Sequence, residues 1–116
     1  MGIKNGGKNF DLGNDNEILS INSPQDHVGG PYAVVHKDIT DRWAIVAMHW
    51  DKKPVLGIRW FYGEGGNPRS TTYSTWLVVP SSLSMNMLSG LSLEQNFRSK
   101  LEDFLSGKID GNKLRN

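Results

Sequence analysis

Histidine is the side chain most used for proton transfer and metal binding near neutral pH, and this sequence carries three, at His27, His36 and His49. They fall in three separate segments. No two of them have the i, i+4 helical spacing or the close clustering that is typical of a metal site. The sequence also contains no cysteine. These observations predict no metal site, no cofactor and no thiol chemistry.

The motifs of hydrolytic and phosphate-binding enzymes are also absent from the sequence. The serines stand in neither a G-x-S-x-G nor an S-x-x-K motif. Glu94, Glu102 and Asp103 fall on the polar side of a predicted amphipathic helix rather than forming an inward-facing pair. The glycine-rich residues 63–66 lie between two predicted strands, whereas phosphate-binding loops lead into a helix. We therefore predict no catalytic residues, and a protein that is not an enzyme.

Aromatic side chains give a stronger signal. The four tryptophans all lie on predicted strands, at Trp43, Trp50, Trp60 and Trp76. Each ring buries roughly 150–250 Å² when enclosed, so these rings can dominate a core or an interface. An arginine between aromatic side chains suits a binding surface. We expect Trp43 and Trp60 in the core, and a binding surface on the other sheet face that includes Trp50, Arg59 and Phe61.

Four β-rich segments would position these side chains. Alternating and β-branched patterns predict strands near residues 32–37, 43–50, 55–62 and 72–79, connected as an antiparallel meander. Apolar residues at spacings of three and four predict a short helix near residues 82–88 and an amphipathic helix over residues 93–106, packed on one face of the sheet. The sequence thus predicts an α+β fold, in a single domain of 116 residues.

The two ends of the chain carry weaker patterns. Residues 1–31 are rich in Asn, Gly and Asp and predict a loop-rich segment, with one short strand over residues 17–21 and edge contacts from Phe10 and Leu12. Residues 108–116 are polar and follow a glycine that ends the last predicted helix. A flexible tail is expected there.

The two central strands predict a hairpin with a four-residue loop over residues 51–54. Placing Trp50 opposite Val55 gives two sets of side chains, and both are apolar, whereas a one-sided antiparallel sheet alternates apolar with polar residues. The same register puts His49 at the hairpin tip beside Asp51. The second face of the sheet therefore needs a cover, which we expect to be a second copy or a partner protein.

Four features occur in order along residues 43–88: Trp50-Asp51 with Pro54, the stretch Ile58-Arg59-Trp60, a glycine-rich loop, and a strand leading through Pro80 into a helix. Residues 43–88 in this respect resemble the single-stranded DNA-binding domain of the positive cofactor four family and its small bacterial relatives. In that family a curved sheet pairs as a dimer and holds the strand by aromatic stacking and basic residues. The sequence differs in lacking a lysine-rich loop and in adding the helix over residues 93–106. The resemblance implies binding residues at Arg59, Trp60, Lys52, Lys53 and Arg69.

Charge and hydropathy restrict the setting. Thirteen lysines and arginines against twelve acids leave a net charge of +1, so no global field draws the chain to nucleic acid or to an anionic membrane. No apolar run approaches the roughly 18 residues of a membrane helix, and the first residues lack the layout of a secretory signal. We expect a cytoplasmic protein without membrane association.

Three functions remain open. The first is a small non-enzymatic interaction module that self-associates or binds a partner through an aromatic-rich sheet face. The second is single-stranded nucleic-acid binding through Arg59, Arg69 and exposed rings. The third is a pocket between helix and sheet that takes an apolar or aromatic ligand. Its expected lining is Trp43, Trp60, Leu56 and Phe97.

Overall fold

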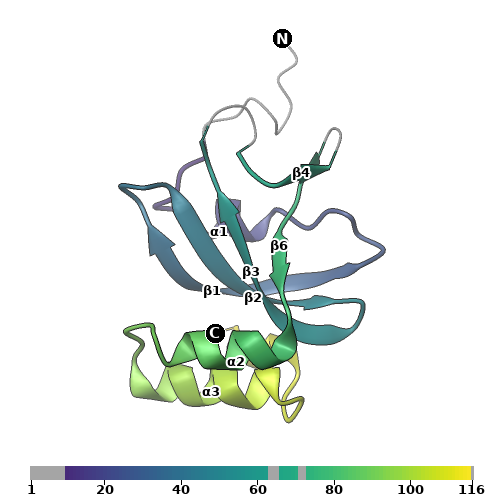
Figure 1. Cartoon of the computed structure of the whole chain (residues 1–116), viewed down its shortest axis with the longest axis vertical. Coiled ribbons are helices and arrows are strands. Elements are labelled where there is room, and N and C mark those ends of the chain that lie inside the picture. Colours follow the sequence, from purple (N-terminus) through teal and green to yellow (C-terminus); the bar gives the residue numbers. More distant parts are fainter. Residues whose placement is uncertain (1–9, 63–65, 71–72, 116) are drawn as a thin grey trace.

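The computed structural model describes residues 10–62, 66–70 and 73–115 (Figure 1). Its main sheet is antiparallel, with the strand order β1-β2-β3-β6. The strands of this sheet are β1 (Val28–Asp38), β2 (Trp43–Trp50), β3 (Lys53–Trp60) and β6 (Leu77–Val79). Two short strands, β4 (Arg69–Ser70) and β5 (Tyr73–Ser74), pair with each other. The predicted α+β fold with an antiparallel sheet is confirmed.

The strand predicted over residues 72–79 is broken in its described part, because β5 and β6 are separated by Thr75 and Trp76. Both residues are held by the N-terminal segment. The Thr75 hydroxyl donates to the Ser23 carbonyl at 2.7 Å, and the Trp76 indole N–H donates to the Ile21 carbonyl at 2.7 Å. These contacts turn the chain out of strand geometry before β6 begins.

Two α-helices follow the sheet. α2 (Ser81–Leu88) and α3 (Gln95–Leu105) confirm the two predicted helices and lie next to each other on one side of the sheet (Figure 1). The helix predicted from residue 93 begins at Gln95 because the Glu94 carboxylate accepts the Phe97 backbone N–H at 3.0 Å and caps it. None of the helices in the described chain is long and apolar enough to cross a membrane.

A short helix, α1 (Asp15–Leu19), stands where a strand was predicted over residues 17–21, so that prediction is wrong. The Asn14 side chain accepts the Asn16 backbone N–H at 3.0 Å and caps the helix. Asp15 and Glu17 place negative charge in its first turn, where the helix dipole favours it. A short apolar run fits helix and strand equally well, and these capping groups decide the outcome.

The sheet face under α2 and α3, here called the helix-covered face, carries Ile45, Ala47, Leu56 and Val79. Its core is closed by buried residues of the two helices and the C-terminal segment: Leu88, Leu101, Phe104, Leu105 and Leu114. Ser84 of α2 is fully buried, and its hydroxyl accepts the Leu56 N–H and donates to the Val79 carbonyl, both at 2.9 Å. This hydroxyl joins α2 to two strands at once.

The opposite face, here called the N-terminal face, carries Ala44, Val46, Met48 and Val55. It is covered by other segments of the same chain, through the buried side chains of Phe10, Leu12, Ile18, Ile21, Phe61 and Trp76. The prediction that both faces of the hairpin are apolar is therefore confirmed. The expectation that a second copy or partner covers the second face is corrected, because the N-terminal segment and the residues after β3 already do so.

The central hairpin differs from its predicted register by two residues. Trp50 pairs with Lys53 rather than with Val55, so the loop is a two-residue turn and not a four-residue loop. Asp51 and Lys52 both have positive φ, 50° and 69°, as a type I′ turn requires. Since a shift of two residues preserves the alternation of side chains, each residue still lies on its predicted face.

The C-terminal residues pack against the sheet. Residues 111–114 form a 3-10 helix, η2 (Gly111–Leu114), in which Gly111 and Leu114 are buried. The Arg115 guanidinium lies 5.1 Å from the centre of the Tyr32 ring. The predicted flexible tail over residues 108–116 is corrected in its described part, because Leu114 belongs to the core of the helix-covered face.

Candidate functional site

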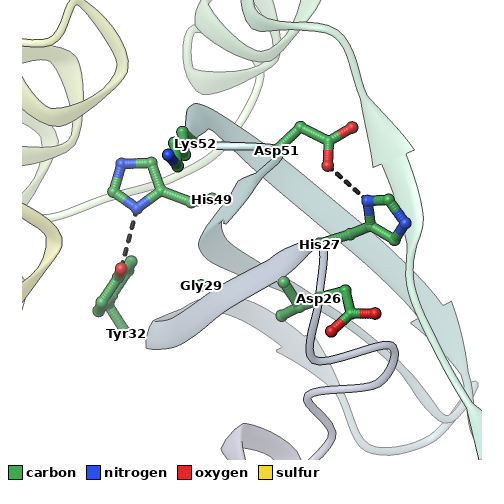
Figure 2. Close-up of a pocket in the computed structure, with 8 residues that line it drawn as sticks. Asp26, His27, Gly29, Tyr32, His49, Asp51 and Lys52 are labelled. Atoms are coloured by element: carbon green, nitrogen blue, oxygen red, sulfur yellow. Dashed lines mark hydrogen bonds and ion pairs between the residues drawn. The ribbon is translucent and has the colours of Figure 1, made fainter.

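A pocket of about 470 Å³, with several titratable side chains in its lining, lies where the β2–β3 turn meets the start of β1. Figure 2 shows His27 and Asp51 on one side of this pocket and Tyr32 and His49 on the other. Its full lining is Asp26, His27, Val28, Gly29, Tyr32, His49, Asp51 and Lys52. Six of these eight lining residues carry titratable side chains.

His27 and Asp51 are joined twice. The imidazole Nδ1 lies 2.5 Å from the Asp51 carboxylate, and the Asp51 backbone N–H donates to the His27 carbonyl at 2.8 Å. The hydrogen bond to this carboxylate raises the pKa of His27 above its ordinary value. The imidazole also stacks on Trp50, with ring centres 5.0 Å apart. These contacts hold the β2–β3 turn against the residue that precedes β1.

Tyr32 and His49 form the second pair, with the Tyr32 hydroxyl 2.9 Å from Nδ1 of His49. Burial lowers the pKa of His49, which favours the neutral imidazole. Both rings meet Phe104 of α3 edge to face. A side chain at Gly29 would crowd this pair, because a Cβ atom there would lie 3.0 Å from the His49 Cβ. The pair therefore joins the sheet to α3.

The chemistry available in this pocket is restricted. No group of three potential metal ligands occurs among the described residues. A histidine oriented by a carboxylate can act as a general base, but no serine or threonine hydroxyl lies among the described lining residues to serve as a nucleophile. Each histidine instead engages a neighbouring side chain that fixes a turn or a helix. Both pairs thus connect segments that are distant in the sequence.

A second, apolar site lies on the helix-covered face, beyond the end of α2. One pocket of about 540 Å³ is lined by Trp43, Ile45, Ile58, Trp60, Asn86, Met87, Ser89, Gly90 and Leu91. Another of about 490 Å³ is lined by Trp60, Tyr62, Asn67, Pro68 and Leu77. Since Trp60 lines both pockets, we call them together the Trp60 groove.

The sheet provides the floor of the Trp60 groove. Trp43 and Trp60 face each other across β2 and β3, and Ile58 is paired with Leu77 of β6. α2 and α3 cover the other end of this face, so the aromatic end remains partly open. Trp60 is 37% exposed, Leu77 50% and Tyr62 55%.

One wall of the groove is the segment that follows α2. The Arg98 guanidinium of α3 donates to the carbonyl oxygens of Leu88 and Leu91, and so satisfies the backbone at the end of α2. The Gly90 N–H donates to the Met87 carbonyl at 3.0 Å. These bonds fix residues 87–91 beside Trp43. The wall is therefore held by α3 as well as by α2.

The structure separates the residues predicted to form one binding surface. Trp60 lines the groove, and Arg69 is exposed on β4. Lys52 and Lys53 are exposed at the opposite end of β3. Trp50 stacks on His27, away from the groove.

Arg59 and Phe61 are buried in the N-terminal face, so their predicted place on an exposed surface is corrected. The Arg59 guanidinium donates to the Pro68 carbonyl at 3.1 Å and to the Thr75 carbonyl, and lies 5.0 Å from the centre of the Phe61 ring. Burial lowers the pKa of Arg59 to about 10. This arginine organises the backbone after β3.

The predicted ligand pocket between helix and sheet has a partial counterpart in the groove, since Trp43 and Trp60 line it. Leu56 is fully buried, and Phe97 packs at the edge of the same core, so neither is among the lining residues. Sequence reasoning missed Met87, Leu91, Tyr62 and Leu77. The apolar Leu91 directly after Gly90 was the available signal, but the convergence of these residues depends on the tertiary packing.

Comparisons of the chain with protein-family models, curated proteins and solved structures found no match. The resemblance of residues 43–88 to the positive cofactor four family stays a prediction.

Proposed function

We propose that this protein is a non-enzymatic interaction module that binds an apolar or aromatic group of a partner in the Trp60 groove. The observation that carries this proposal is the partial exposure of Trp60, Tyr62 and Leu77 around two adjoining pockets. Pockets of 300–1,000 Å³ with mainly apolar and aromatic walls and a few polar groups are typical of ligand sites. Here Asn86, Ser89 and Asn67 are among the polar groups.

The exposed part of Trp60 sets the scale of the interaction. If its whole ring surface is roughly 150–250 Å², the 37% that is exposed corresponds to roughly 55–90 Å². Covering this area contributes about 1.5–2 kcal/mol at about 25 cal/mol per Å². Tryptophan is enriched among the residues that dominate binding energies. Trp60 is therefore the residue whose loss should weaken binding most.

The distribution of positive charge favours an apolar partner over a nucleic acid. Lys53 and Trp60 stand seven positions apart in one strand, about 23 Å at about 3.3 Å per residue. Arg59 is inside the core. Among the described residues, neither groove pocket has a charged lining side chain, whereas single-stranded nucleic acids are bound by rings and phosphate-neutralising cations together.

Nuclear magnetic resonance with free indole as the probe tests this proposal. The four tryptophan indole N–H signals report separately. Those of Trp43 and Trp60 should shift in a saturable way, while that of Trp76, bonded to the Ile21 carbonyl, should stay in place. Trp60→Ala should remove the shift at Trp43. Tyr73→Ala is the matched control, because Tyr73 is 57% exposed but lines neither groove pocket.

Two outcomes would refute the proposal. One is the absence of any shift at Trp43 and Trp60 at millimolar indole. The other is equal loss of binding in the Trp60 and Tyr73 variants. A short oligonucleotide titrated at low and high salt checks the alternative, since salt-sensitive shifts at Trp60 would point to nucleic acid instead.

A further inference from the structure

The Trp60 groove has two compartments rather than one. The first is framed by Trp43 and Trp60 from neighbouring strands, with Met87 and Leu91 beside them. The second is also lined by Trp60, together with Tyr62 and Leu77. The Trp60 side chain thus forms a shared wall that a single compact group in one compartment would leave half uncovered.

The distance between the compartments follows from the sheet. One lies over β2 and β3, and the other lies over β3 and β6, which is the next strand in the sheet order. Neighbouring strands are about 4.8 Å apart, so the two compartments are offset across the sheet by about 5 Å. Side chains at positions i and i+2 of an extended chain are about 6.7 Å apart and point the same way. The two spacings differ by less than about 2 Å, so two alternate side chains of one extended segment can reach both compartments.

The chemistry of the walls also selects the occupant. Within the described chain, no Asp, Glu, Lys or Arg lines either compartment. A charged side chain entering the groove would lose hydration without gaining a partner charge from these described lining residues, which is unfavourable. The amides of Asn86 and Asn67 offer both donors and acceptors, one in each compartment, and such groups suit the peptide backbone of an extended segment.

We propose that the Trp60 groove recognises an extended segment of a partner protein that carries uncharged apolar side chains at two alternate positions. An aromatic side chain enters the compartment of Trp43, and an aliphatic one enters the compartment of Leu77. This inference rests on the proposed function, because it names the class of partner for the same groove. Recognition of two alternate side chains requires both compartments to be filled by one segment.

Three capped peptides test the inference on the full chain. The first is acetyl-Ser-Phe-Ser-Leu-Ser-amide, with the apolar residues at alternate positions. The second is its isomer acetyl-Ser-Ser-Phe-Leu-Ser-amide, in which they are adjacent. The third, acetyl-Ser-Phe-Ser-Ser-Ser-amide, offers one apolar residue. By magnetic resonance titration we expect the first to bind at least fivefold more tightly than either of the others.

A variant of the second compartment sharpens the test. Leu77→Ser should weaken binding of the alternating peptide to the affinity of the single-phenylalanine peptide. The affinity of the single-phenylalanine peptide itself should stay unchanged. Leu83→Ser is the matched control, because Leu83 is 52% exposed on α2 and lines neither compartment. It should change none of the three affinities. Circular dichroism verifies that both variants keep the fold.

The outcomes separate this inference from the proposed function. Equal binding of the two isomers, or an alternating peptide that is insensitive to Leu77→Ser, would overturn the extended-segment inference while indole still shifts Trp43 and Trp60. If indole also fails to shift the Trp43 and Trp60 signals, both the extended-segment inference and the proposed function are overturned. A concentration-dependent dimer that Leu77→Ser dissociates and Leu83→Ser does not would assign the groove to a second copy, and would also overturn the inference.

Discussion

The buried hydroxyl of Ser84 offers a test of how α2 is fixed to the sheet, and with it one wall of the Trp60 groove. It accepts the Leu56 N–H and donates to the Val79 carbonyl, each at 2.9 Å. Ser84→Ala leaves both backbone groups without this partner. A buried polar group that loses its hydrogen bond costs about 1–3 kcal/mol. We therefore expect a loss of about 2–4 kcal/mol in the free energy of unfolding.

Urea unfolding followed by tryptophan fluorescence and by circular dichroism measures this loss. The midpoint should fall while the slope stays constant, as for a change in stability alone. Ser82→Ala is the matched control on an exposed position of the same helix, and it should change stability by less than about 0.5 kcal/mol. A loss below about 1 kcal/mol for Ser84→Ala, or equal losses for both variants, would refute the assigned role of this hydroxyl.

Three further perturbations follow from the structure. Gly111→Ala should destabilise the fold by about 1–3 kcal/mol in urea unfolding, because its Cβ atom would lie 2.3 Å from the Tyr32 ring. Magnetic resonance titration should place the midpoint of His27 above 6.5 and that of His49 below 6.5. The His49 contribution to stability is then present above pH 6.5 and lost as pH falls through its folded pKa, whereas the His27 contribution is present below pH 6.5 and lost as pH rises through its folded pKa. Lys52→Gly should raise stability by about 0.5–1 kcal/mol, since φ at this turn position is 69°.

Each of these expectations has its own check. Gly90→Ala should be nearly neutral, because its nearest neighbour to a new Cβ atom is 3.6 Å away. Asp51→Asn should return the His27 midpoint toward 6.5 and leave that of His49 in place. Titration midpoints of His27 and His49 on the same side of 6.5 would contradict the environments described for the two histidines. Unchanged stability in Gly111→Ala would contradict its close packing against Tyr32. A loss of stability in Lys52→Gly would contradict the cost of positive φ at this turn position.

The sequence was informative where the signal is local and periodic. The strand at Trp43–Trp50 has the predicted bounds, and both helices after the sheet were expected. Each side chain of the hairpin also lies on the face predicted for it, although the predicted register was wrong, because a two-residue shift leaves the alternation of side chains unchanged. The register was wrong because Pro54 was assigned to the loop, whereas in the structure it belongs to β3 and is paired with His49, the second pair from the turn.

The remaining features depend on contacts between distant segments. Whether a partner or the chain itself covers the N-terminal face was decided by Phe10 and Ile18, which lie far from the sheet in sequence. Arg59 was expected at the surface because its neighbours are aromatic, but it is buried and donates to the carbonyl oxygens of Pro68 and Thr75. The groove could not be predicted as a whole, since its outline is set by where α2 ends above Trp43.

Binding of the alternating peptide by calorimetry tests the interaction role of the Trp60 groove most directly. Titration at several temperatures should show a negative heat-capacity change, which marks the burial of apolar surface. Trp60→Ala should weaken the affinity at least tenfold, consistent with the loss of about 1.5–2 kcal/mol from the covered ring, and Tyr73→Ala should leave it unchanged. Undiminished binding by Trp60→Ala, or a heat-capacity change near zero, would contradict the proposal that this groove is where the protein binds its partner.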